Sequence, residues 1–169
     1  MPENLYTPNC IRTFTGIYMN VFEPTPEMIC IEDIAHALSN QCRFGGHLPE
    51  FYSVAQHSTR CCDAAIPKYK IEALLHDASE AYLLDIPSPI KKNLSNYHEI
   101  EHRLMMLIAE KFKFNYPLSD EVKELDKMAL EFEWQHHMIA PFFEPPNLLC
   151  LTNKDAEKLF LNLFHEWKN

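Results

Sequence analysis

The chain has 169 residues, of which 47% are apolar, and carries a formal net charge of −9. This length fits one domain, residues 1–169, with enough apolar material for a substantial core. The negative charge argues against stable nucleic-acid binding and against a general attraction to anionic membranes, so an anionic substrate would need a local cationic site. No apolar run reaches membrane-spanning length.

Six cysteines are present, two of them adjacent, and no pair has C-x-x-C spacing. This pattern fits neither a zinc knuckle nor a disulfide framework, so we expect mostly buried thiols in a protein from a reducing compartment. The first ten residues lack the basic and apolar regions of a signal peptide. We therefore expect a cytoplasmic location.

The N-terminal part predicts a short extended element followed by helix. Residues 11–26 alternate apolar and polar β-formers, which indicates a strand or a small hairpin. Residues 28–42 have apolar residues at helical spacing, and the Gly- and Pro-containing residues 43–49 then end that helix. The chain has only three glycines, which leaves little material for the turns of an all-β fold.

The rest of the chain predicts helix after helix, with proline-rich breaks. Ser119 is the expected N-cap of one long helix, and Thr152 or Asn153 that of the last. Residues 85–93 contain two prolines and predict a rigid connector or one short helical turn. The expected helices are residues 50–66, 70–84, 97–112, 119–138 and 152–168, separated before the last by residues 140–147. The fold expected is therefore all-α.

The stretch "EALLHDASEAYLLDIPSPIKK" (residues 72–92) places three chemically active side chains next to an apolar helix face. His76 and Glu80 are four residues apart, and Asp77 and Glu80 three, so all three can point to one spot. Two carboxylates and an imidazole at an apolar wall are costly unless a cation lies between them. The stretch alone leaves two interpretations open: a divalent metal site, or a neighbouring cap, salt bridge and core histidine.

Two residues elsewhere are further candidate ligands. His57 lies on the preceding predicted helix, with Val54 and Cys61 on its apolar side, and Asp126 lies beside an apolar helix face. Taken alone, the first fits a core histidine and the second a solvated acid. Imidazole and carboxylate together suit Zn, Co, Mn, Fe or Mg.

The order of these residues resembles the HD superfamily of metal-dependent phosphohydrolases, over nearly the whole chain. That family has a histidine, then an adjacent His-Asp pair, then a distant aspartate, matched here by His57, His76, Asp77 and Asp126. "HDASEAYLLDIPSPIK" is similar to the 5′-deoxynucleotidase branch. "IEDIAHALSNQCRFGGH" and "FYSVAQHS" resemble a subgroup common in phages that includes small dATP triphosphohydrolases. The resemblance implies an HD-domain helical bundle, and a host-cytoplasmic location for a phage-encoded protein.

The resemblance also implies roles for individual residues. The four matched residues would hold one divalent ion (Zn, Co, Mn or Mg), and the resemblance leaves open a second ion that binds together with the substrate. Glu80 would be the general base or would orient the attacking water; the alternative is a surface salt bridge to Lys91.

A second group of residues would bind the substrate. Arg43 would swing over the metal to a phosphate and contribute to catalysis; the alternative is a helix-capping arginine. Phe44 would lie near the base or sugar, and Asp85 would seat the sugar. His47 and Lys91 are weaker phosphate-binding candidates.

The function expected is hydrolysis of deoxynucleotides, with dATP cleaved to deoxyadenosine and triphosphate as the first choice, and dADP and dAMP as further substrates. A 5′-deoxynucleotidase acting on monophosphates would use the same metal chemistry. A non-catalytic metal- or nucleotide-binding HD module would keep the ligands but lose Glu80 or Arg43, and both are present. We also expect a homo-oligomer, with Phe142 and Phe143 offering apolar surface.

Overall fold

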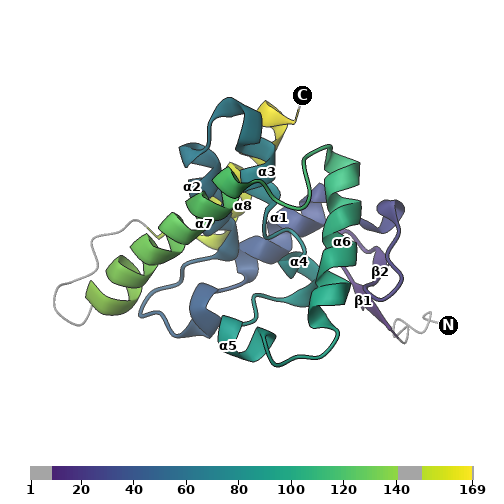
Figure 1. The fold of residues 1–169 in the computed structure, drawn as a ribbon, viewed down its shortest axis with the longest axis horizontal. Coiled ribbons are helices and arrows are strands. Elements are labelled where there is room, and N and C mark those ends of the chain that lie inside the picture. Colours follow the sequence, from purple (N-terminus) through teal and green to yellow (C-terminus); the bar gives the residue numbers. More distant parts are fainter. Residues whose placement is uncertain (1–8, 141–149, 169) are drawn as a thin grey trace.

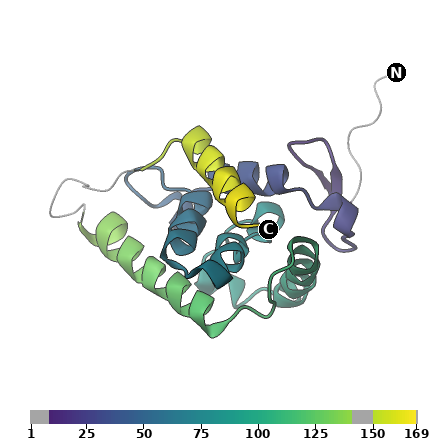
Figure 2. The same ribbon diagram turned by 90° about the horizontal axis from the view of Figure 1, so that it is seen from above.

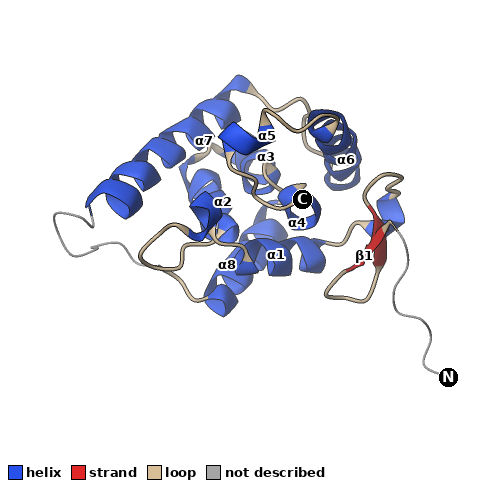
Figure 3. Cartoon of the chain, turned by 90° about the horizontal axis from the view of Figure 1, so that it is seen from below, coloured by secondary structure: helices blue, strands red, loops and turns tan. Residues whose placement is uncertain are grey.

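The computed structural model describes residues 9–140 and 150–168, and within them the protein is mostly helical (Figures 1 and 3). The all-α expectation is confirmed. In chain order the helices are α1 (Ile31–Asn40), α2 (Val54–Ala64), α3 (Lys70–Leu75), α4 (Glu80–Leu83), α5 (Ser88–Lys91), α6 (Tyr97–Phe112), α7 (Asp120–Glu133) and α8 (Asn153–Trp167). Short 3₁₀ turns lie at Pro26–Met28, Arg43–Gly46 and Pro67–Tyr69, and a π-helical turn at Trp134–Ile139.

The N-terminal segment forms the hairpin rather than a single strand. Strands β1 (Cys10–Arg12) and β2 (Tyr18–Asn20) pair antiparallel and bury Met19 against the helices. The turn between them is fixed to α1, because the Thr15 backbone and hydroxyl both donate to the Asp33 carboxylate, at 2.7 and 2.8 Å. The hairpin covers one end of the helical body. It lies on the opposite side of the molecule from the C-terminal end of α7 (Figure 1).

The core is formed where α1, α2, α3 and α8 pack on one another. Leu38, Leu74 and Phe160 come from three of these helices and are fully buried. Helix α3 lies between α6 and α7, which flank the core on two sides (Figures 1 and 2). This arrangement brings α2, the end of α3 and α7 together on one side of the core.

Two predicted caps are present, and one alternative is decided. The Ser119 hydroxyl accepts from the Val122 amide at the start of α7, and Thr152, not Asn153, caps α8 by accepting from the Asp155 amide. Such a bond satisfies a backbone donor that a helix end leaves free. The expected turn of helix within residues 85–93 is α5.

The predicted helix over residues 70–84 is wrong as a continuous element. It is interrupted after Leu75, and the amides of Ala78 and Glu80 donate to carbonyls only three residues back, at 3.0 and 2.9 Å. The His76 side chain contributes to this interruption. Its Nδ1 donates to the Ala73 carbonyl at 2.7 Å, so a side chain, and not only backbone amides, hydrogen-bonds to the last turn of α3. The His-Asp pair consequently lies in a tight turn between α3 and α4.

The predicted helix over residues 119–138 is also modified, since α7 changes to π-helical geometry after Glu133. The expectation that most cysteines are buried is wrong: only Cys61 and Cys62 are buried, and the other four are half-buried. Those four lie at the edges of elements, where solvent reaches them: Cys10 in β1, Cys30 just before α1, Cys42 just after α1 and Cys150 just before α8.

None of the helices in the described ranges combines the length and the hydropathy needed to cross a membrane. The interface expected at Phe142 and Phe143 lies outside the described residues.

Candidate metal centre

The four expected ligands converge on one point from three elements. His57 comes from α2, His76 and Asp77 from the turn after α3, and Asp126 from α7. The Nε2 atom of His57 lies 3.2 Å from Nε2 of His76 and 3.1 Å from Oδ1 of Asp126. The Asp77 Oδ2 atom lies 3.2 Å from Nε2 of His76 and 3.7 Å from Nε2 of His57. Helices far apart in sequence therefore present two imidazole nitrogens and two carboxylate oxygens to one small space.

These separations fit a shared cation. Nitrogen and oxygen ligands lie roughly 2.0–2.2 Å from a zinc-sized ion, so two ligands at angles of about 90–120° are separated by about 3.0–3.6 Å. The recorded separations between the two imidazole nitrogens and the carboxylate oxygens run from 3.1 to 3.7 Å. These separations lie within or close to that range, so the residues present fit a divalent ion.

The hydrogen bonds of the two imidazoles point to the same conclusion. Nδ1 of His76 contacts the Ala73 carbonyl at 2.7 Å, and Nδ1 of His57 contacts Oε1 of Glu133 at 2.7 Å. A carbonyl and an ionised carboxylate can only accept, so both Nδ1 atoms carry the hydrogen. Without a cation, the neighbouring carboxylates outweigh burial and raise the pKa of both rings well above the usual value, so each Nε2 then carries a hydrogen as well. A bound ion would replace these two hydrogens and accept the Nε2 lone pairs, an arrangement typical of metal-ligating histidines.

Charge within the cluster keeps the acids ionised. Burial alone would raise the pKa of Asp77, but the neighbouring His76 holds the pKa well below its usual range. Burial likewise opposes ionisation of Asp126, but the hydrogen bond from His57 and the nearby His76 imidazole lower its pKa strongly. Both carboxylates are thus charged and available to a cation.

Glu133 was not identified from the sequence, yet it connects most of the site. It is fully buried, and its carboxylate accepts from His57 Nδ1, from the Tyr52 hydroxyl at 3.0 Å and from Arg43 Nε at 3.2 Å. Burial opposes ionisation, but His57 and Arg43 lower its pKa. Its spacing was the available signal, because Glu133 follows Asp126 by two helical turns and so shares its face of α7.

Arg43 is held in place rather than free to swing. Its guanidinium is buried, with Nη2 3.2 Å from Glu133 Oε2 and Nη1 3.6 Å from Asp77 Oδ2. The expected movement over the metal is therefore corrected: the carboxylates of Glu133 and Asp77 fix the guanidinium in place. These contacts also differ from those of a helix-capping arginine. Phe44 is half-buried beside it, with its ring centroid 6.0 Å from that of Trp134.

Glu80 is buried at the start of α4, in contrast to the alternative of a surface salt bridge. Its Oε2 atom has no hydrogen-bond partner among the described residues, while Oε1 lies 3.9 Å from Lys91 Nζ. Burial and the charges of Asp77 and Asp85 raise the pKa of Glu80 well above its usual value. This shift favours the protonated acid when no cation is bound. A cation beside Asp77 would favour the ionised form, which can accept a proton through Oε2.

The weaker substrate-binding candidates are placed less favourably. Lys91 forms an ion pair with Glu101, and His47 is exposed on the turn after Arg43–Gly46. Asp85 is half-buried, and its amide donates to Gln41 Oε1 at 3.1 Å.

Gln41, a residue that the sequence did not single out, connects both ends of α4. Its amide nitrogen donates to the Glu80 carbonyl at 2.9 Å, and its oxygen accepts from Asp85. This one side chain therefore fixes the segment that carries both acids to the end of α1.

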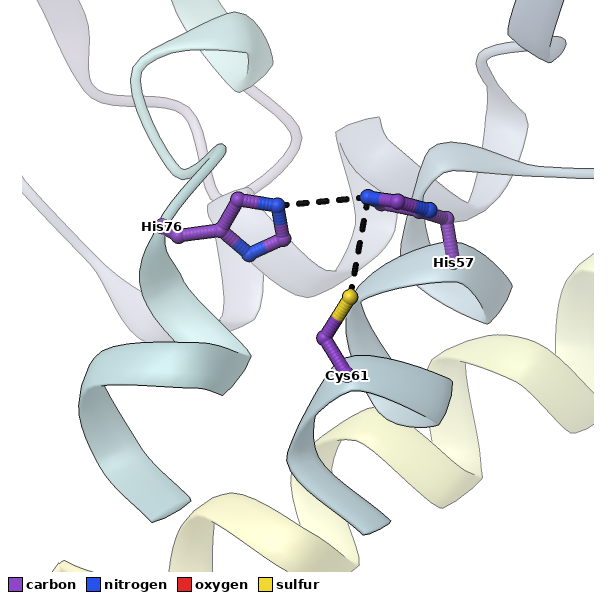
Figure 4. Close-up of side chains that lie close together, drawn as sticks. All are labelled: His57, Cys61 and His76. Carbon is purple, nitrogen blue, oxygen red and sulfur yellow. Dashed lines mark hydrogen bonds between the residues drawn. The ribbon is translucent and has the colours of Figure 1, made fainter. Parts of the chain in front are cut away.

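Cys61 lies close to the expected ligands, which the sequence did not indicate. Its Sγ atom is 3.8 Å from Nε2 of His57, and the possible ligand atoms of His57, Cys61 and His76 all lie within 4.8 Å of one another (Figure 4). The sequence marked Cys61 only as a residue on an apolar helix side. This buried group could bind a metal ion.

No family model matches the sequence. The chain is 42% identical over 167 residues to the uncharacterized protein YfdR of Escherichia coli strain K12, a match that covers 92% of this chain and 94% of YfdR. The chain belongs to the YfdR family. An uncharacterized protein of Rhodobacter capsulatus is 33% identical over 159 residues, covering 88% of this chain and 78% of that protein.

In this YfdR-family chain the centre combines three chemical capacities. His57 and His76, with two ionised acids, can hold a divalent cation. Glu80 offers a buried carboxylate oxygen, and Arg43 a fixed guanidinium beside Asp77. A cation site, a proton acceptor and a fixed positive charge within one cluster are the groups that hydrolysis of a phosphate ester requires.

Proposed function

We propose that this protein is a metal-dependent phosphohydrolase of the HD superfamily that acts on deoxynucleotides. The observation that carries the proposal is the convergence of two imidazole nitrogens and two ionised carboxylates, from three separate elements, at separations of 3.1–3.7 Å. The order of these residues along the chain matches that family's ligand pattern.

A divalent ion held by His57, His76, Asp77 and Asp126 would lower the pKa of a water molecule and neutralise charge on the phosphoryl oxygens. Glu80 accepts the proton of the attacking water, or orients that water, through the oxygen that has no other described partner.

Arg43 positions the phosphoryl group. Its Nη1 atom is the guanidinium nitrogen that lies toward Asp77, while Nε and Nη2 are bound by Glu133. Because the guanidinium is already held in one orientation before the substrate binds, it loses little conformational entropy when it contacts a phosphate.

The first substrate proposed is dATP, cleaved to deoxyadenosine and triphosphate, with dADP and dAMP as further substrates. Open space at the turn Arg43–Gly46 supports the triphosphate substrate. A Cβ atom placed on Gly46 would meet nothing within 4 Å, which leaves room for a phosphate tail. Its positive φ of 80° is a backbone conformation that suits glycine.

A second candidate, a 5′-deoxynucleotidase, is favoured by a different observation. Arg43 and Lys91 are both paired with carboxylates, which leaves little free positive charge for β- and γ-phosphates. A single phosphate makes a smaller electrostatic demand than three.

A substrate panel tests the proposal. Metal-free protein would be loaded with Zn²⁺, Co²⁺, Mn²⁺ or Mg²⁺ and offered the four dNTPs and four dNMPs, with nucleoside, phosphate and triphosphate separated by chromatography. We expect dATP to give deoxyadenosine and triphosphate, and we expect His76→Ala to lose that activity, which excludes a contaminating phosphatase. Activity confined to monophosphates would overturn the dATP assignment in favour of the nucleotidase. Metal binding with no hydrolysis of any of the eight would favour the non-catalytic module.

A further inference from the structure

We propose that Cys61 is a thiolate ligand of the metal centre, and that the site therefore selects a thiophilic ion such as Zn²⁺ or Co²⁺ over Mg²⁺ and Mn²⁺. The inference rests on the metal centre of the proposed function and not on its substrate. It adds a sulfur donor to the two histidines and two aspartates that the resemblance implies.

The position of the sulfur carries the proposal. Cys61 follows His57 by one turn of α2, so both side chains lie on one face of that helix. Figure 4 shows Sγ of Cys61 and Nε2 of His76 approaching the same nitrogen of His57 from two sides. An ion about 2.3 Å from sulfur and roughly 2.1 Å from nitrogen would separate them by about 3.1–3.8 Å at angles of 90–120°. The recorded separation of 3.8 Å is at the end of that range.

The surroundings of the sulfur direct it inward. Cys61 is 1% exposed and packs with Ala73 of α3 and with Val122 and Ala129 of α7. Together with Cys61 on α2, these neighbours on α3 and α7 belong to the same three parts of the fold that carry the proposed ligands. The side chain thus forms the apolar floor of the centre, with its sulfur on the side of the imidazoles.

The chemistry of the donor determines the ion. Thiolate is a soft ligand that suits Zn²⁺ and Co²⁺, whereas Mg²⁺ and Mn²⁺ prefer oxygen. On binding, a sulfur–metal bond replaces the S–H bond, and the thiol proton passes to solvent. The competing interpretation is a thiol that only contacts His57 as a weak donor, in which case metal choice would not depend on sulfur.

The neighbouring cysteine offers a matched control. Cys62 is also fully buried and one residue away, but it packs in the main core with residues such as Val54 and Leu74, rather than in the small cluster of Cys61. Burial raises the pKa of the Cys62 thiol to about 12, which disfavours its thiolate. A Cys62→Ser change therefore perturbs the same helix without altering the proposed donor.

The test uses Co²⁺ as a spectroscopic probe of the full chain. Wild type, Cys61→Ser and Cys62→Ser would each be made metal-free and titrated with one equivalent of Co²⁺. We expect a sulfur-to-cobalt charge-transfer band in the near ultraviolet for wild type and Cys62→Ser. Cys61→Ser should bind one Co²⁺ without that band. His76→Ala should lose the band too, which excludes Co²⁺ bound at half-buried cysteines.

Competition titrations measure selectivity. The preference for Zn²⁺ over Mn²⁺ should fall on the order of tenfold or more in Cys61→Ser and stay unchanged in Cys62→Ser. X-ray absorption of Zn²⁺-loaded wild type provides a measurement that needs no variant: it should detect one sulfur neighbour at about 2.3 Å.

The outcomes separate the two proposals. Co²⁺ binding by wild type without the band, or a band that persists in Cys61→Ser, would overturn the thiolate assignment and leave the metal centre intact. No binding of Co²⁺ or Zn²⁺ by wild type would overturn the metal centre itself, and the proposed function with it.

Discussion

The Nδ1 nitrogen of His57 lies 2.7 Å from Oε1 of Glu133, and both residues are fully buried. This bond joins the N-terminal part of α2 to the last residue of α7, across 76 positions of the chain. Because the same carboxylate also binds Arg43, one acid fixes both a proposed metal ligand and the cation proposed to bind phosphate.

Replacing Glu133 by glutamine should weaken metal binding. The change keeps the shape of the side chain but removes the ionised acceptor that orients His57. Loss of such a partner typically lowers metal affinity by about 10–100-fold. Competition with a chelating dye would measure the affinity, with Glu131→Gln, an exposed site two residues earlier on α7, as the control. An affinity equal to that of wild type would show that Glu133 does not position His57.

His76→Ala and Asp77→Ala should each remove bound metal and activity. Each change deletes one of the four converging donors, and the remaining ones no longer enclose the ion. Elemental analysis of the purified variants would measure metal content, with the exposed Asp63→Ala on α2 as control. A fully active variant without metal would contradict the site assignment.

Removal of the ion should also lower the stability of the wild type. A ligand that binds only the folded state stabilises it by about 2.7 kcal/mol at a free concentration 100 times its Kd. Thermal unfolding with and without a chelator measures this difference, and in His76→Ala the chelator should have no effect. An identical Tm for chelated and metal-loaded wild type would argue against a bound structural ion.

Glu80→Gln should keep the metal yet lose turnover by about 10²–10⁴-fold, because the proposed role of this residue is proton transfer rather than coordination. Phosphate or triphosphate release beside elemental analysis separates the two effects. The exposed Glu99→Gln serves as the matched control. Unchanged turnover would leave Glu80 as a structural residue paired with Lys91.

Arg43→Ala should lower both stability and kcat/KM. Removing one partner of a buried ion pair leaves Glu133 without part of its compensation, which costs about 3–5 kcal/mol. Urea unfolding of the metal-free protein measures this loss, and Arg103→Ala, an exposed site on α6, should leave stability unchanged. Normal kinetics in a folded Arg43→Ala protein would contradict its role toward phosphate.

The sequence by itself determined the elements whose signals are local. Apolar spacing predicted α6 with its observed bounds, residues 97–112, and Ser119 was identified as the cap of α7. Both features depend on residues three or four positions apart, so a short stretch contains the information needed. The resemblance to the HD superfamily, which rests on the order of His57, His76, Asp77 and Asp126, identified residues that the fold brings together, though not their geometry.

Only the tertiary structure decided how the site is built. Arg43 and Glu133 are 90 residues apart, and nothing in either local pattern shows that burial forces them to pair. The break after Leu75 was missed because apolar spacing continues across it, while the side-chain bond from His76 to the Ala73 carbonyl accompanies a tighter turn. From the sequence, Cys61 is predicted to be an ordinary core residue. Only the packing of α2 against α3 places its sulfur beside two imidazoles. Periodicity reports which face of a helix is buried; which partners meet there is set by the packing of distant elements.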